Sequence, residues 1–97
     1  YRYVFDEIFI PALVRFRPDA LIVSAGQDGL ADDEHGRMNL VPEDYGVLTG
    51  MLIDGADLPL ALTLEGGYGP SLGKAVAAIF RALAGERPAP AEKVRFC

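Results

Sequence analysis

One polar segment of the sequence, residues 25–41, carries side chains that could bind a divalent metal ion. Asp28, Asp32 and Asp33 offer carboxylate oxygens, and His35 offers an imidazole nitrogen. Both donor types ligate divalent metals in proteins. A single aspartate cannot hold such an ion, so a metal site here would need further ligands from elsewhere in the protein. The alternative interpretation is a solvated acidic loop in which Asp28 caps a turn.

A second segment, Glu65–Gly69, could provide a hydrogen-bond donor for catalysis. Its paired glycines, Gly66 and Gly67, can adopt positive φ and let the backbone approach a bound group closely. The phenol of Tyr68 could donate a hydrogen bond to a developing oxyanion, or could instead be buried as the cap of a loop. A phosphate-binding loop is disfavoured, because no Lys or Ser/Thr stands at P-loop spacing and Glu65 would repel an anion. A metal-polarised carbonyl opposite a tyrosine donor is a layout for amide hydrolysis.

Two short apolar runs predict the strands that position these segments. The runs Ala20–Ser24 and Leu60–Leu64 are continuous rather than alternating, which is typical of strands buried on both faces of a parallel sheet. The acidic segment follows the first strand, and the glycine segment follows the second. Since ligands bind beyond the carboxyl ends of the strands in open α/β sheets, we expect the two segments to meet at one edge. The strand–helix–strand unit should be right-handed.

Two helices are predicted from the spacing of apolar residues before and between the strands. The first covers residues 3–16, with a kink or break expected near Phe9–Ile10 because a proline follows. It should end at Arg17–Pro18, since the residue before proline is pushed out of the α region. The second covers residues 42–53 and is expected to stop at Asp54–Gly55.

A third helix is predicted after the glycine segment. It opens at Pro70 and closes at Gly85. The tail, residues 86–97, is expected to be extended. The predicted inner face of this helix consists of Leu72, Ala75, Val76, Ile79, Phe80 and Leu83.

Composition narrows the class of protein. The 97 residues are 51% apolar, with 9 basic and 14 acidic side chains and a net charge of −5. So apolar a chain is not disordered, and its acidic balance excludes a basic nucleic-acid-binding surface. No apolar run approaches the ~18 residues of a membrane span.

The apolar content is high for one small domain, so we expect a fragment that packs against more protein. The only cysteine, Cys97, leaves no internal disulfide and favours a reducing, cytoplasmic location.

Four motifs together resemble the histone deacetylase family, which includes the bacterial and archaeal acetylpolyamine and acetoin-utilisation deacetylases. They are Ser24–Asp28 (Ser-Ala-Gly-Gln-Asp), Asp33 five positions after Asp28, Met38–Leu40 (Met-Asn-Leu) and Leu64–Tyr68 (Leu-Glu-Gly-Gly-Tyr). The resemblance extends to about residue 85.

The resemblance implies an α/β fold of three layers, in which helices flank an open and mostly parallel sheet, as in arginases and deacetylases. Residues 1–97 would be the C-terminal part of one deacetylase catalytic domain, containing a β-α-β unit. The implied activity is that of a Zn²⁺-dependent deacetylase, with Fe²⁺ as the alternative metal. Metal-activated water would hydrolyse the acetyl amide of acetyl-lysine or of acetylated polyamines. The family's histidine bases and two further metal ligands lie upstream, so we expect the 97-residue chain alone to be inactive.

The resemblance also implies roles for five residues. Asp33 would be a metal ligand. Tyr68 would be the catalytic tyrosine that polarises the acetyl carbonyl and stabilises the oxyanion. Leu40, Gly66 and Gly67 would bind substrate as parts of the acyl-lysine tunnel.

One segment, Asp33–Gly36, departs from the family, because many members have Asp-Pro-Leu-Gly where this chain has Asp-Glu-His-Gly. We expect His35 to face solvent, with a rim contact or metal ligation as the alternatives. Asp32 could compete with Asp33 as the ligand, and the family's spacing from Asp28 favours Asp33.

The implied partners are an acetylated lysine protein or an acetylated small amine as substrate, and the missing N-terminal part of the same domain. No direct contact with nucleic acid or membrane is expected, and an oligomer is compatible with the sequence. The alternative function is a degenerate, non-catalytic binding domain of the same fold, against which the retention of Asp33 and Tyr68 argues. A nucleotide-binding α/β module is disfavoured, because the first strand leads into Ser24–Asp28 rather than into a phosphate-binding glycine loop.

Overall fold

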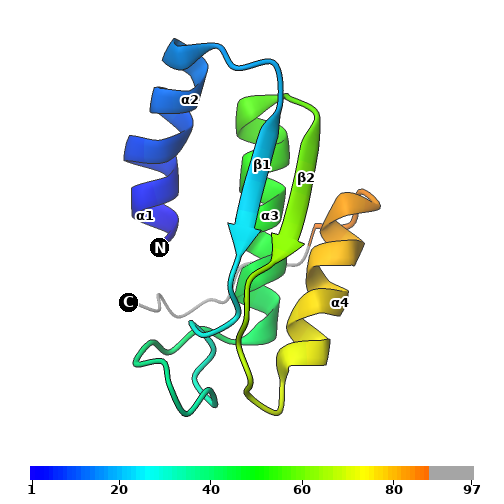
Figure 1. Ribbon diagram of the computed structural model, residues 1–97. Helices are drawn as coiled ribbons and strands as arrows, with labels where there is room; N and C mark the ends of the chain where they lie inside the picture. The colour runs from blue at the N-terminus through cyan, green and yellow to red at the C-terminus, as the bar shows by residue number, and fades with distance from the viewer. Residues whose placement is uncertain (88–97) are drawn as a thin grey trace.

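The N-terminal segment is one helical rod with a widened turn in its middle. The computed structural model describes residues 1–87, and the rod consists of α1 (Arg2–Val4), the π-helical segment η1 (Phe5–Phe9) and α2 (Ile10–Phe16) (Figure 1). In place of the expected break near Phe9–Ile10, the Ile10 N–H donates to the Phe5 carbonyl, which is a π-type bond. The rod therefore continues through Pro11, whose ring nitrogen cannot donate a hydrogen bond, to the end of α2.

The rod ends where the sequence predicts. Its last helical residue is Phe16, and Arg17 adopts the left-handed conformation with φ of 57°. Pro18 follows, and the α region is disfavoured for the residue before proline. The expected end at Arg17–Pro18 is thus confirmed.

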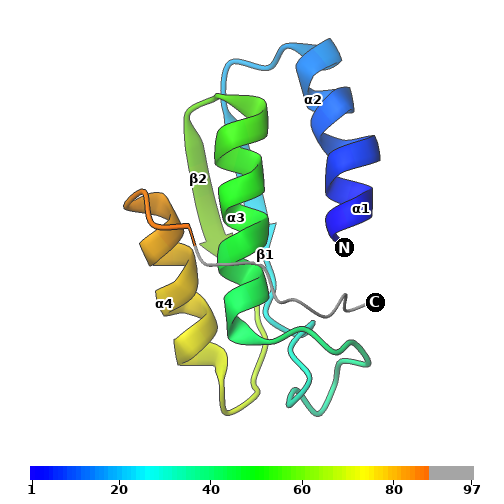
Figure 2. The same ribbon diagram turned by 180° about the vertical axis from the view of Figure 1, so that it is seen from behind.

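The centre of the fold is a two-stranded parallel sheet. Strand β1 (Leu21–Ala25) pairs with β2 (Leu60–Leu64), from Leu21↔Leu60 to Ala25↔Leu64. Helix α3 (Pro42–Ala56) connects them and lies behind the sheet, so the crossover is right-handed (Figures 1 and 2). The predicted strand–helix–strand unit is confirmed, with β1 shifted by one residue.

Helix α3 runs further than the sequence predicts. Asp44 supports its start, because Oδ2 accepts the N–H of Val41 at 2.8 Å, which offsets the lack of a polar side chain at the cap. The predicted stop at Asp54–Gly55 is wrong, since the helix continues to Ala56 and ends at Asp57, with φ of 52°. A Cβ on Gly55 would lie 2.8 Å from Ile10 Cδ1. That glycine therefore permits close contact with the N-terminal rod and does not end the helix.

The inner face of α4 (Leu72–Leu83) differs from the predicted one. Pro70 lies in a turn before the helix rather than at its first position. The prediction that Phe80 and Leu83 point inward is wrong, because they are 65% and 43% exposed. The buried residues of α4, which packs against α3, are mostly small and leave room for close approach of the two helices: Ala75, Ala78, Ile79 and Ala82.

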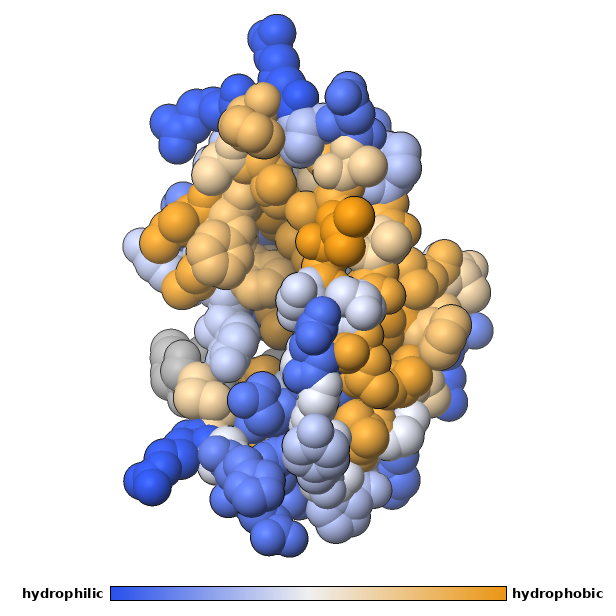
Figure 3. Space-filling model, viewed as in Figure 1, coloured by the Kyte–Doolittle hydropathy of each residue, from blue (hydrophilic) through white to orange (hydrophobic). Residues whose placement is uncertain are grey.

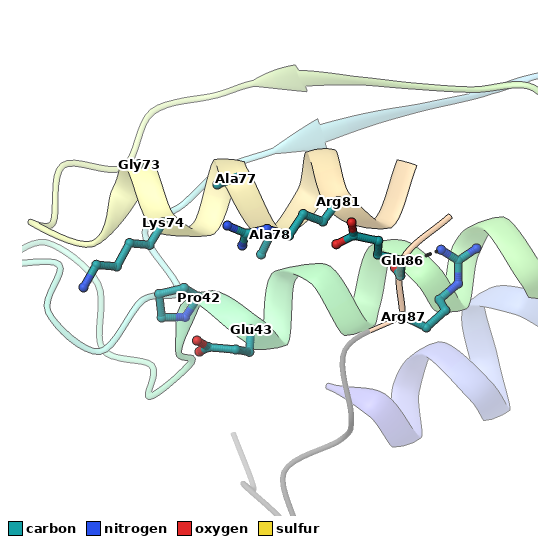
Figure 4. A pocket seen from close by; sticks show the side chains of 9 residues that line it. All are labelled: Pro42, Glu43, Gly73, Lys74, Ala77, Ala78, Arg81, Glu86 and Arg87. Carbon is teal, nitrogen blue, oxygen red and sulfur yellow. Dashed lines mark hydrogen bonds between the residues drawn. The ribbon is translucent and has the colours of Figure 1, made fainter. Parts of the chain in front are cut away.

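The end of α4 is tied to α3 beside a charged cleft of about 530 Å³ (Figure 4). Arg87 donates to both carboxylate oxygens of Asp54 at 2.9 and 3.1 Å, and Nη1 donates to the Ala82 carbonyl at 2.6 Å. The Arg87 guanidinium lowers the pKa of the Asp54 carboxyl. These contacts hold the C-terminal end of α4 against α3. The predicted extended tail falls mostly on residues 88–97, which lie outside the described residues.

Residues 1–87 cover only one of the two faces of the sheet. The prediction of strands buried on both faces is wrong here, because the residues of β1 alternate between half-buried and exposed, with Ile22 74% exposed. Apolar side chains spread over the uncovered face and the neighbouring helices (Figure 3). An apolar groove of about 700 Å³ runs between β1 and the N-terminal rod, lined by Phe9, Phe16 and Ile22 among others. Within the described part of the chain, no helix is long and apolar enough to cross a membrane.

The long connection between β1 and α3 packs down onto the core, as its apolar residues predict. Leu30 and Leu40 are 1% and 4% exposed and form an isolated parallel bridge. The Ala31 N–H donates to the Leu40 carbonyl at 2.8 Å, and the Leu40 N–H donates to the Gly29 carbonyl at 3.0 Å. The connection is therefore a folded loop with its own buried anchor.

Truncation of the Leu30 side chain in this anchor should lower the stability of the protein. Replacing a fully buried Leu by Ala costs about 2–5 kcal/mol, because apolar contacts are lost and a cavity remains. We expect Leu30→Ala to lower the free energy of unfolding in urea by that amount. Lys74→Ala, at an exposed position of α4, is the control and should stay within about 0.5 kcal/mol of the wild type. Equal stability of the two variants would contradict the buried anchor.

Candidate active site at the carboxyl ends of the strands

The acidic loop and the glycine turn meet beyond the carboxyl ends of β1 and β2, as the parallel topology predicts (Figure 1). The Gln27 N–H donates to the Gly66 carbonyl at 3.0 Å. The Tyr68 N–H donates to Asp33 Oδ2 at 2.7 Å, across 35 positions of sequence. The two segments that could carry chemistry therefore form one site.

Asp33 is a buried carboxylate held by backbone donors. The residue is 5% exposed, and Oδ1 accepts the N–H groups of His35 and Gly36 at 2.8 and 2.9 Å. The hydrogen bond from the Tyr68 N–H is the largest of several that lower the Asp33 pKa, against the opposing effect of burial. Donors that favour the ionised form stabilise the carboxylate at neutral pH.

The fit of Asp33 to a metal can be judged from its free lone pairs. A carboxylate has about four lone-pair sites, and the three N–H donors occupy three of them. One site is left for a cation. No group of three His, Cys, Asp or Glu side chains within residues 1–87 could hold a metal ion, whereas catalytic zinc sites use three protein ligands. The described part of the chain thus fits one ligand position, and the others would have to come from elsewhere.

Tyr68 presents its side chain to solvent at the edge of the site. It is 77% exposed, which excludes the alternative of a buried tyrosine in this part of the chain. The His35 ring lies edge-on to the Tyr68 ring, with centroids 6.4 Å apart and planes at 85°. His35 is itself exposed, as expected. The phenol is therefore accessible to solvent, while the backbone N–H of the same residue is bonded to Asp33.

The two glycines adopt the positive φ that the sequence predicts, at 81° for Gly66 and 104° for Gly67. Gly67 is buried, and a Cβ there would lie 2.7 Å from the backbone Cα and C of Gln27. Leu40, also buried, lines a small pocket with Tyr45. Substrate contact by Leu40, Gly66 and Gly67 stays a prediction.

Two further residues shape the site beyond the roles expected from the sequence. Asp32, considered as a competing ligand, accepts hydrogen bonds from the backbone and hydroxyl of Ser71. Gln27 is fully buried, and its Nε2 donates to the Ala25 carbonyl at 2.8 Å. A polar residue three positions after the end of a predicted buried strand is the available signal for Gln27. For Asp32, no local pattern indicates a partner 39 positions away.

Comparison with known proteins gives consistent matches. The family model described as "Histone deacetylase domain" matches residues 1–83. An uncharacterized protein of Synechocystis sp. is 47% identical over 77 residues, covering 78% of this chain and 25% of that protein. The polyamine deacetylase HDAC10 of Danio rerio is 36% identical over 91 residues, covering 93% of this chain and 13% of that protein.

Solved structures give the same result. The structure of the histone deacetylase Clr3 matches 100% of this chain and 16% of its own, with a TM-score of 0.89 at 35% identity. The three-dimensional arrangement of residues 1–87 is therefore that of part of a deacetylase fold. The chain spans about a quarter or less of the length of each of these proteins.

The lowered pKa of Asp33 predicts how acid affects stability. The carboxylate stabilises the fold above its ordinary pKa of 3.8, and this contribution is lost as the pH falls through the lower folded-state value. Asp33→Asn should therefore be less stable than the wild type at neutral pH, and the difference should shrink as the pH falls below 3.8. Urea unfolding with a chelator present measures this. Glu34→Gln, at an exposed position of the same loop, should show no such trend, and a pH-independent difference for Asp33→Asn would contradict the account.

The two glycines should differ in their tolerance of a side chain. Gly66→Ala incurs mainly the penalty of a non-glycine residue at positive φ, about 1–2 kcal/mol. Gly67→Ala incurs that penalty and also forces its Cβ against the Gln27 backbone. Thermal unfolding should show a larger loss of stability for Gly67→Ala than for Gly66→Ala. Equal losses would mean that Gln27 does not lie against Gly67.

Proposed function

Since this chain belongs to the histone deacetylase family, we propose that it forms the C-terminal part of the catalytic domain of a metal-dependent deacetylase. The hydrogen bond from the Tyr68 N–H to Asp33 Oδ2 carries this proposal. It joins the candidate metal ligand to the candidate oxyanion donor. Hydrolysis of an acetyl amide would use both groups at the reacting carbonyl, a metal as Lewis acid and the phenol as hydrogen-bond donor to the oxygen.

Asp33 would bind the metal, and Tyr68 would donate a hydrogen bond to the substrate. When bound, Zn²⁺ or Fe²⁺ supplies a Lewis acid for the acetyl carbonyl and lowers the pKa of a coordinated water. Asp33 would hold the cation through its remaining lone pair, and its lowered pKa keeps it ionised for that purpose. Tyr68 would donate its hydroxyl hydrogen to the carbonyl oxygen as negative charge develops on it. Its exposed side chain is free to approach a substrate that enters from solvent.

The walls of the substrate channel would come from the residues beside this pair. Gly66 and Gly67 bring backbone close to the site without side chains. Leu40 would supply an apolar surface for the acyl chain, although here it packs against neighbouring side chains.

The remaining ligands and the general base would come from residues outside the described part of the chain. The uncovered sheet face supports this arrangement, because Ile22 and its neighbours leave an apolar surface that isolated domains normally bury. The groove between β1 and the N-terminal rod extends that surface. We therefore propose that the rest of the same domain packs against both.

The substrate would be an acetylated lysine in a protein or an acetylated polyamine. Clr3 is called a histone deacetylase, and the Danio rerio relative a polyamine deacetylase. The net charge of −5 favours cationic substrates of either kind.

Removal of the Tyr68 hydroxyl should slow the chemical step. Loss of one oxyanion-hole donor lowers kcat by about 10²–10³-fold in other hydrolases. We expect Tyr68→Phe in the full-length protein to lower kcat by that order while metal content stays at the wild-type level. Asp33→Ala should instead lose metal. Tyr3→Phe, the same change on the exposed face of α1, is the control. An unchanged kcat for Tyr68→Phe would remove Tyr68 from the mechanism.

A further inference from the structure

We propose that Asp32 is a positioning residue for Tyr68, acting through Ser71 at the start of α4. The inference rests on the proposed role of Tyr68 in catalysis. Asp32 makes no contact with the reacting groups in this proposal. Its effect is transmitted through the backbone of the turn from Tyr68 to Ser71.

The contact between Asp32 and Ser71 uses both oxygens of one carboxylate. Oδ2 accepts the Ser71 N–H at 3.0 Å, and Oδ1 accepts the Ser71 hydroxyl hydrogen at 2.9 Å. Ser71 is the N-cap of α4, a helix of 12 residues. A carboxylate is favoured at that end, because the first N–H groups of a helix lack partners and carry partial positive charge.

Adjacent carboxylates therefore hold the two ends of the same turn. Asp33 accepts the N–H of Tyr68, and Asp32 accepts the N–H of Ser71 three residues later. Because Asp32 and Asp33 are neighbours in one loop, the turn is attached to that loop at both of its ends.

Gly69 lies inside this double attachment. It is buried, and a Cβ there would overlap Asp32 Oδ1 and lie 3.1 Å from the backbone C and O of Asp32. The acidic loop and the turn are thus in direct backbone contact between their two hydrogen-bonded ends. Because Gly69 has no side chain, Asp32 can lie against the turn and accept the two hydrogen bonds from Ser71.

The attachment matters because residues 1–87 bury little of the Tyr68 side chain. It is 77% exposed, its ring lies edge-on to His35, and its hydroxyl lies over Gly66, where a Cβ would be 3.5 Å away. Gly66 and Gly67 precede it, and glycine leaves the backbone freer than any other residue. A misplacement of about 1 Å in a catalytic group can cost about 10²-fold in rate. The backbone anchors are therefore what would fix the position of the phenol.

Kinetics of the full-length protein test the proposal. Asp32→Ala should lower kcat by about tenfold with KM and metal content unchanged, because Tyr68 is misplaced but still present. Asp32→Asn should recover most of the rate, since its amide oxygen can still accept from Ser71. Ser71→Ala should give a smaller loss, and the double variant Asp32→Ala/Ser71→Ala should be no slower than Asp32→Ala. Glu34→Ala, which removes one exposed charge from the same loop, is the matched control and should keep the wild-type kcat.

Amide hydrogen exchange provides a second readout that needs no turnover. In Asp32→Ala, the amides of Tyr68 and Ser71, which donate to Asp33 and Asp32, should exchange at least tenfold faster than in the wild type, while those of β1 and β2 keep their protection. If the wild type proves inactive on acetylated substrates, the proposed function fails, and faster exchange still supports the positioning role. Unchanged exchange, or a kcat for Asp32→Ala equal to that of Glu34→Ala, would overturn the inference. So would an equal loss of rate in Asp32→Asn and Asp32→Ala.

Discussion

A hydrogen bond between the Tyr68 N–H and the Asp33 carboxylate is the interaction on which the site depends. Burying a carboxylate is costly unless hydrogen-bond donors surround it, and Asp33 is 5% exposed. Two donors come from its own loop, and the third comes from the turn after β2. That third donor is available because the strands are parallel and end at the same edge. The requirement of one buried charge thus links the sheet topology to the position of the phenol.

The rest of the structure keeps this meeting point in place. Leu30 and Leu40 anchor the acidic loop on the core, and α3 returns the chain to the start of β2. Helix α4 packs against α3 through small side chains and starts where Asp32 holds Ser71. The phenol of Tyr68 is exposed, while the carboxylates that accept hydrogen bonds from its turn are buried at Asp33 and doubly bonded at Asp32. Such a division lets a residue contact substrate without losing its position.

Much of this arrangement could be predicted from the sequence. Two apolar runs, each followed by a polar segment, fix the parallel β-α-β unit and bring Asp33 to Tyr68. The errors arose where tertiary contacts decide: Gly55 permits contact with Ile10, and small residues of α4 replace Phe80 at the helix interface. The prediction that both faces of the sheet are buried is wrong for residues 1–87, because burial of the second face depends on protein outside these residues. The Asp32–Ser71 contact has no local signal, since it joins positions 39 apart.

The most direct test of the account is a crystal structure of the full-length protein with an alkyl hydroxamate, a chelating analogue of the acetyl amide. We predict that the Asp33 carboxylate ligates the metal while it still accepts the Tyr68 N–H. The Tyr68 hydroxyl should lie within about 2.6–3.2 Å of the hydroxamate carbonyl oxygen. A metal bound without Asp33, or a Tyr68 hydroxyl turned away from that oxygen, would contradict the central claim that one hydrogen bond couples the metal ligand to the oxyanion donor.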